Sequence, residues 1–175
     1  TPSPGGAGFD AIVSNGTFTP PDPILAVGPG HLVAIVNSRY QVWDKSGTPL
    51  IGALTLDQFF GGVPHCTGLF DPFVDYDEAA NRYVLGAIRL ESTPTGSDSY
   101  LCVAGSATND PLGTWNRTSF RADAVDPGTW LDYPHMGIGL DAIYIAGNMF
   151  EDGGGFDSLR ALAVEKDARY QGTAA

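Results

Sequence analysis

The sequence has 175 residues, of which 23 are Gly and 13 are Pro, together well above their usual share of roughly 12%. This composition excludes a protein built from long helices. A formal net charge of −11 argues against nucleic acid and against an anionic membrane surface as partners. With 43% hydrophobic and 17% charged residues, the chain has enough apolar side chains for a folded core.

The chain contains no segment of membrane-spanning length. Its longest uninterrupted aliphatic run is Leu32 to Val36, far short of the roughly 20 residues that a spanning helix needs. We therefore expect no membrane insertion.

Residues 1–23 are rich in Pro, Gly, Ser and Thr and predict an extended lead-in. After them, apolar residues occur in runs of four to eight separated by turn residues, which predicts strands. Residues 158–166 are ambiguous because Leu, Ala and Glu favour helix, and context favours a strand there. We expect the other strands at 32–37, 39–44, after the turn at 45–48, and at 73–76, 83–90, 100–106, 115–120, 135–139 and 142–148.

The two cysteines, Cys66 and Cys102, are too few for a zinc knuckle and too far apart for a CxxC redox motif. They form either a disulfide or two buried thiols. We favour the disulfide, which would suit an exported protein and would stabilise the fold by roughly 3–4 kcal/mol.

A theme of an Asp and a Pro, a short apolar strand, a tight turn and a longer apolar strand occurs three times. The copies begin at Asp22, Asp71 and Asp132, 49 and 61 residues apart. A unit of about 50 residues with three or four antiparallel strands is the size of a propeller blade. The prediction is an all-β fold of β-propeller blades, approximately 24–60, 69–120 and 130–175, in one portion over 24–175. A β-sandwich is the alternative.

Four ordered motifs carry a family resemblance: PPDPILAVGPGHLVAIVNSRYQVWDKSG, DPFVDYDEAANRYVLG after the first Cys, CVAGSATNDPLGTWNRTSF, and DYPHMGIGLDAIYIAGNMF. Together they resemble a group of bacterial secreted β-propeller proteins with a sialidase-like fold, most of them without an assigned activity. The resemblance covers residues 20–150. It implies an extracellular or cell-surface protein with about three blades here, roughly half of such a propeller. A second chain or self-association would then complete the ring.

The Asp residues that open the repeats, Asp22, Asp71 and Asp132, are expected near the start of each blade's innermost strand, towards the central channel. They either bind a cation or a sugar hydroxyl, or accept backbone N–H bonds that fix the turn, and we favour the turn role. Trp130 is the best exposed aromatic candidate for stacking on a sugar or a partner.

Two acidic loops have suitable ligands for calcium: Asp75, Asp77 and Glu78 in one, and the EDGGGFD segment at 151–157 in the other. Neither follows the EF-hand spacing. A hairpin turn with solvated carboxylates is the simpler interpretation of the first loop, and a mobile loop that of the second.

Tyr133 and His135 stand two apart and share one face of a strand. With Asp132 they could serve as acid and base in a polysaccharide lyase or glycoside hydrolase, although a packed Tyr beside a hydrogen-bonded His is more common. The seven Arg residues share no position in the repeat, which departs from the sialidase pattern. We therefore favour a binding or structural module for a glycan or a protein chain, with a carbohydrate-active enzyme as the alternative.

Overall fold

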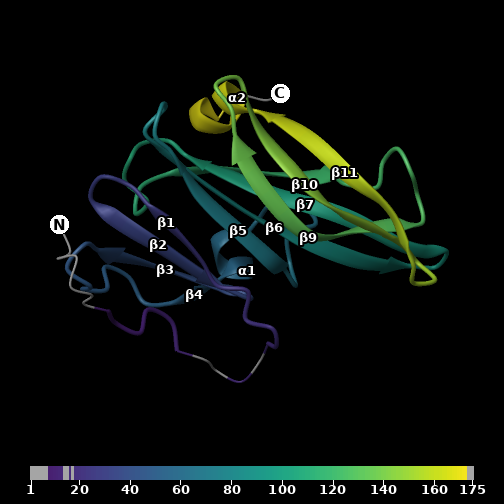
Figure 1. Ribbon diagram of the computed structural model, residues 1–175, viewed down its shortest axis with the longest axis horizontal. Coiled ribbons are helices and arrows are strands. Elements are labelled where there is room, and N and C mark those ends of the chain that lie inside the picture. The colour runs from purple at the N-terminus through teal and green to yellow at the C-terminus, as the bar shows by residue number, and fades with distance from the viewer. Residues whose placement is uncertain (1–7, 14–15, 17, 173–175) are drawn as a thin grey trace.

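The computed structural model describes residues 8–13, 16 and 18–172 of the chain. Within this part the protein is all-β, with eleven strands in three antiparallel sheets and two short helices. Each sheet is built from one continuous segment of sequence, and its strands pair in chain order. Figure 1 shows the three sheets side by side, with the second between the other two.

The first sheet has four strands in the order β1-β2-β3-β4. Its two long apolar runs, residues 32–37 and 39–44, were predicted as strands, and both are confirmed. The third expected strand, after the turn at 45–48, is reduced to a bridge at Pro49 and the short β4. The bounds are β1 (Ile24–Val27), β2 (His31–Val36), β3 (Arg39–Asp44) and β4 (Leu54–Thr55).

The second sheet is the centre of the molecule and is covered on both faces. One face packs against the first sheet and the other against the third, so the inner parts of its strands are buried at consecutive positions rather than alternating ones. Its bounds are β5 (Phe70–Asp77), β6 (Arg82–Thr93), β7 (Gly96–Ser106) and β8 (Trp115–Arg121).

The third sheet has three strands in the order β9-β10-β11, and one of its faces is buried against the second sheet. Residues 158–165 form a strand as predicted, but Lys166 begins a helix. The bounds are β9 (Thr129–Ile138), β10 (Ala142–Glu151) and β11 (Phe156–Glu165).

Two short helices were not predicted. In α1 (Leu56–Phe59), Thr55 and Gln58 form a capping box in which each side chain bonds the other's backbone. In α2 (Lys166–Gln171), Tyr170 packs into the core between the second and third sheets. Both helices fill the space beside sheets rather than adding a layer.

Cys66 and Cys102 form the expected disulfide. Cys102 lies in β7 and Cys66 lies in the connection between α1 and β5, and both are buried in the cluster between the first and second sheets. The bond thus ties the connection between the first two sheets to the centre of the second. A disulfide is compatible with an extracellular location.

The first strands of the three sheets lie next to one another, β1 beside β5 and β5 beside β9. The ends at which these strands begin therefore meet in one region of the molecule. The described residues form no closed ring, so the structure establishes three sheets in sequence and leaves the propeller and the sandwich as alternatives.

Candidate functional site

The residues just before Pro23, Pro72 and Pro134 adopt the same uncommon backbone conformation. Asp22, Asp71 and Tyr133 have φ values of 43°, 46° and 50°, in the left-handed region that residues other than Gly rarely occupy. The repeat therefore aligns Tyr133, rather than Asp132, with the first two Asp residues. The extra residue before Pro134 displaces the third Asp by one position.

Asn37, which was not among the predicted site residues, joins two of these turns through its side chain. Asn37, just after β2, donates from Nδ2 to Oδ2 of Asp22 at 2.8 Å, and its Oδ1 accepts the backbone N–H of Asp71 at 3.0 Å. The N–H of Tyr133 in turn donates to Oδ2 of Asp71 at 3.1 Å. These bonds link all three sheets. Asp22 and Asp71 thus hold neighbouring turns together, whereas the role that we favoured was to accept backbone N–H bonds within their own turns. The sequence did hold a signal for this missed residue: the long apolar strand ends in an Asn in both the first and the third repeat, at Asn37 and Asn148.

Asp132 lies against Asp71, and its pKa is raised. Burial is the largest cause, followed by the negative charge of Asp71, a hydrogen bond that protonated Asp132 donates to Asp71, and the charge of Asp22. Two neighbouring carboxyls cannot both ionise freely, which is why the charge of Asp71 adds to the effect of burial on the pKa of Asp132.

The raised pKa of Asp132 predicts an unusual pH dependence of stability. Because this pKa lies above the value of 3.8 for an ordinary Asp, the folded state binds the proton more tightly than the unfolded state. The contribution of Asp132 to the free energy of unfolding therefore falls as pH rises above that value. We expect Asp132→Asn to remove this fall, so that the variant gains stability relative to the unaltered chain between about pH 4 and pH 7. Urea unfolding across this range measures the difference, and parallel profiles for the two proteins would contradict it.

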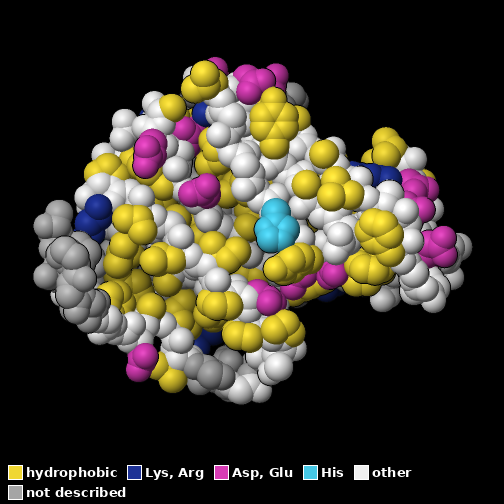
Figure 2. Space-filling view, viewed as in Figure 1, with side chains coloured by type: hydrophobic (Ala, Val, Ile, Leu, Met, Phe, Trp, Pro, Cys, Tyr) yellow, Lys and Arg dark blue, Asp and Glu magenta, His cyan; other side chains and the backbone are white. Residues whose placement is uncertain are grey.

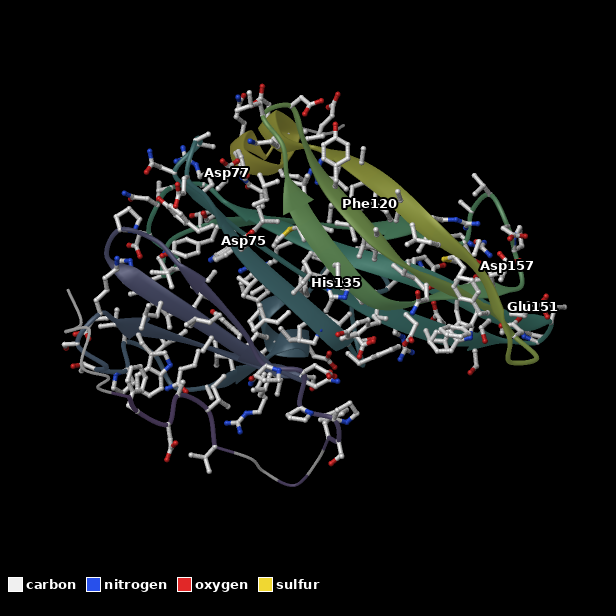
Figure 3. The ribbon with its side chains drawn as sticks, in the orientation of Figure 1. Asp75, Asp77, Phe120, His135, Glu151 and Asp157 are labelled. Atoms are coloured by element: carbon white, nitrogen blue, oxygen red, sulfur yellow. A yellow bond between two sulfur atoms is a disulfide. The ribbon has the colours of Figure 1, made fainter. Side chains whose placement is uncertain are left out.

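The three turns surround a cavity of about 290 Å³. Its wall combines two carboxylates with three rigid proline rings, an aromatic ring and an imidazole. The lining residues are Asp22, Pro23, Ile24, Asp71, Pro72, Tyr133, Pro134 and His135. In Figure 2 the one visible histidine lies beside a group of acidic side chains at the edge of a hollow, and Figure 3 identifies it as His135 at the centre of the molecule.

Tyr133 and His135 point to the same side of β9, as the alternation predicted. Their rings pack edge to face with centroids 4.6 Å apart. Tyr133 keeps 57% of its surface exposed, so its ring is available at the mouth of the cavity. Of the three predicted catalytic residues, Tyr133 and His135 line the cavity and Asp132 does not. Their catalytic role stays a prediction.

Trp130 does not reach this cavity. It lies at the start of β9, half-buried, with its ring 5.5 Å from that of Phe150 in β10. Its proposed role in ligand binding has no support from this position.

The structure gives no support for calcium at the first acidic loop. Asp77 is buried, and its carboxylate accepts hydrogen bonds from Lys166 and Tyr170 of α2. Among the described residues no group of three or more His, Cys, Asp or Glu side chains is placed to hold a metal ion. In Figure 3, Asp75 and Asp77 lie left of the centre of the molecule, well separated from Glu151 and Asp157 at its right end. Calcium at Asp75, Asp77 and Glu78 remains a prediction without structural support.

Comparisons with known proteins bring no match from family models, from curated proteins or from solved structures. The resemblance to secreted sialidase-like propellers therefore remains a prediction from the sequence motifs. No helix in the described part of the chain is long and apolar enough to cross a membrane.

Proposed function

We propose that this chain is a portion of an exported β-propeller that binds a glycan at the cavity between the three turns. Two features of the fold support the propeller: each sheet is a meander that begins at the strand nearest the other sheets, and β1, β5 and β9 are neighbours in that order. The disulfide supports export.

The observation that carries glycan binding is the composition of the cavity wall. Sugars present C–H faces that stack on aromatic and proline rings, and hydroxyls that donate to carboxylates. Tyr133 and the three prolines provide the first kind of surface, while Asp22 and Asp71 provide the second. The lining includes no Lys or Arg, so an uncharged or amino sugar fits better than a uronate.

Binding is tested by titration calorimetry with neutral, amino-sugar and uronate oligosaccharides. We expect neutral or amino sugars to bind and uronates to fail. Tyr133→Ala should weaken affinity at least about tenfold, because the exposed ring provides the stacking surface. Tyr100→Ala is the matched control. Tyr100 lies in β7 of the second sheet, where its ring stacks on that of His65, and it does not line the cavity. Absence of binding by all three sugar classes would reject the proposal.

The second candidate function is a carbohydrate-active enzyme, favoured by the hydrogen-bonded carboxyls of Asp71 and Asp132. A carboxyl with a raised pKa is a better general acid than an ordinary Asp. However, the two acids of a glycosidase stand about 5–10 Å apart, on either side of the scissile bond, whereas these two are in direct contact. Hydrolysis of an oligosaccharide that is lost in Asp132→Asn, with binding retained, would favour the enzyme over the binding module.

A further inference from the structure

The cavity between the three turns carries negative charge that no described cation neutralises. Asp22 and Asp71 line it, and its lining includes neither Lys nor Arg. Neither carboxylate forms an ion pair with another described residue, and Arg39 lines a different hollow, beside Asn37. After burial as the largest cause, the charges of both carboxylates also raise the pKa of nearby Asp132. The electrostatic potential in the cavity is therefore negative.

The two lining carboxylates keep hydrogen-bond acceptors in reserve. A carboxylate has about four acceptor positions. From the described residues, Asp22 accepts one hydrogen bond, from Asn37. Asp71 accepts the N–H of Tyr133 and is also hydrogen-bonded with Asp132. These bonds hold both side chains in place, and the acceptors that remain suit a ligand group with several N–H donors.

The composition of the cavity wall favours an ammonium group over a metal ion. Calcium takes six to eight oxygen ligands, whereas most of this lining is apolar or aromatic. No group of three or more His, Cys, Asp or Glu side chains in the described part of the chain is placed to hold a metal. A primary ammonium group has three N–H donors, and it is also attracted to the face of an aromatic ring such as that of Tyr133.

The rest of the wall suits a sugar ring better than a flexible amine. The rings of Pro23, Pro72 and Pro134 and the 57% exposed ring of Tyr133 provide rigid surfaces for C–H groups. A volume of about 290 Å³ lies at the lower end of the range for ligand sites. The cavity therefore has room for a single sugar ring, and the rest of an oligosaccharide would lie outside it.

We propose that the cavity selects a sugar that carries a protonated amine, with the ammonium group held by Asp22 and Asp71 and the sugar ring against Tyr133. This inference rests on the proposed glycan binding and narrows the ligand to an unacetylated amino sugar. Acetylation removes the positive charge and leaves a single N–H donor, so an acetamido sugar loses the contacts that distinguish the site.

The test compares trisaccharides that differ only at C2 of each ring: β-1,4-linked glucosamine, N-acetylglucosamine and glucose. Titration calorimetry is run at about pH 6, where primary amines are protonated. We expect the glucosamine trisaccharide to bind one per chain, at least about tenfold more tightly than the other two. Nα-acetyl-lysine amide, which has the ammonium group on a flexible chain without a sugar ring, should show no measurable binding.

Asp22→Asn tests the role of the carboxylate in this preference. The new amide oxygen can still accept the hydrogen bond from Asn37, so the turn keeps its link to β2. We expect the ratio of the affinities for the glucosamine and glucose trisaccharides to fall towards one. Circular dichroism checks the fold. Asp71→Asn, whose amide oxygen can likewise accept the N–H of Tyr133, is the second probe if the first variant fails to fold.

A matched control is needed because a chain of net charge −11 attracts any cationic sugar weakly. Asp157→Asn removes the same charge from an exposed position in β11 that does not line the cavity. Figure 3 shows Asp157 at the right end of the molecule, away from His135. The preference for the amine should be unaltered in this variant.

Separate outcomes decide the inference and the proposed function. Equal affinities for the three trisaccharides would overturn the inference and leave glycan binding intact. The inference also fails if Asp157→Asn lowers the preference as much as Asp22→Asn, because the attraction would then be general. Binding of the lysine amide as tight as that of the glucosamine trisaccharide would show that the ammonium group alone is recognised, and would overturn it too. No binding by any trisaccharide would reject both glycan binding and the inference.

Discussion

Replacing Lys166 by Met is expected to lower the free energy of unfolding by about 3–5 kcal/mol, because it leaves a buried carboxylate without its counter-ion. Lys166 is 5% exposed, and its Nζ lies 2.6 Å from Oδ2 of Asp77 and 2.7 Å from the carbonyl of Gly139. The hydroxyl of Tyr170 donates to the same oxygen of Asp77 at 2.8 Å. Asp77 ends β5 and Lys166 begins α2, so this group fastens the second sheet to the end of the third. Urea unfolding at neutral pH measures the loss.

Two further variants separate the charge effect from lost packing. Lys166→Met combined with Asp77→Asn should recover much of the stability, because no buried charge is then unpaired. Lys45→Met removes an exposed cation and should change stability by less than about 0.5 kcal/mol. Equal losses in the single and double Lys166 variants would show that the charge of Asp77 is not the cause.

The effect of Lys166→Met should also depend on pH. Burial alone would raise the pKa of Asp77, but the bonds from Lys166, Tyr170 and the N–H of Ala80 lower it below 3.8. The contribution of Asp77 is therefore complete above that value and is lost as pH falls through the lowered pKa. The difference between the variant and the unaltered chain should narrow in acid.

Removal of the disulfide should lower the free energy of unfolding by about 4 kcal/mol, because the cross-link spans 36 residues and restricts the unfolded chain. The variant is Cys66→Ala with Cys102→Ala, and the denaturant midpoint gives the loss. Cys66→Ala alone is the matched control, since it already breaks the bond and should cost nearly as much as the double variant. A loss below about 1 kcal/mol would mean that the bond constrains little in the unfolded state.

Most strands could be predicted from the sequence, because turn residues bound the apolar runs at 32–44, 83–90 and 100–106 closely. The missed helices have different explanations. The pattern Thr55-x-x-Gln58 is a capping box and was available as a signal for α1. The six residues of α2 are too few for a helical period to appear, and α2 is stabilised by contacts of Lys166 and Tyr170 with Asp77.

Part of the candidate site could be predicted from the sequence repeat. The repeat indicated that Asp22, Asp71 and Asp132 would approach one another, since equivalent turns meet when equivalent strands do. Local sequence could not show that Asn37 bridges the first two turns, or that Tyr133 takes the third left-handed position. The bond between Tyr170 and Asp77 joins residues 93 apart in sequence. Such contacts follow from how the sheets pack, which spacing does not reveal.

The burial of the second sheet on both faces has a consequence for how the molecule unfolds. Its apolar side chains at Tyr83, Leu85 and Cys102 need the first sheet in place, while Val84, Ile88 and Val103 need the third. Neither neighbour can detach without exposing a full layer of these side chains to water. Although the sequence consists of repeats, the three sheets therefore form one cooperative unit rather than three modules of separate stability.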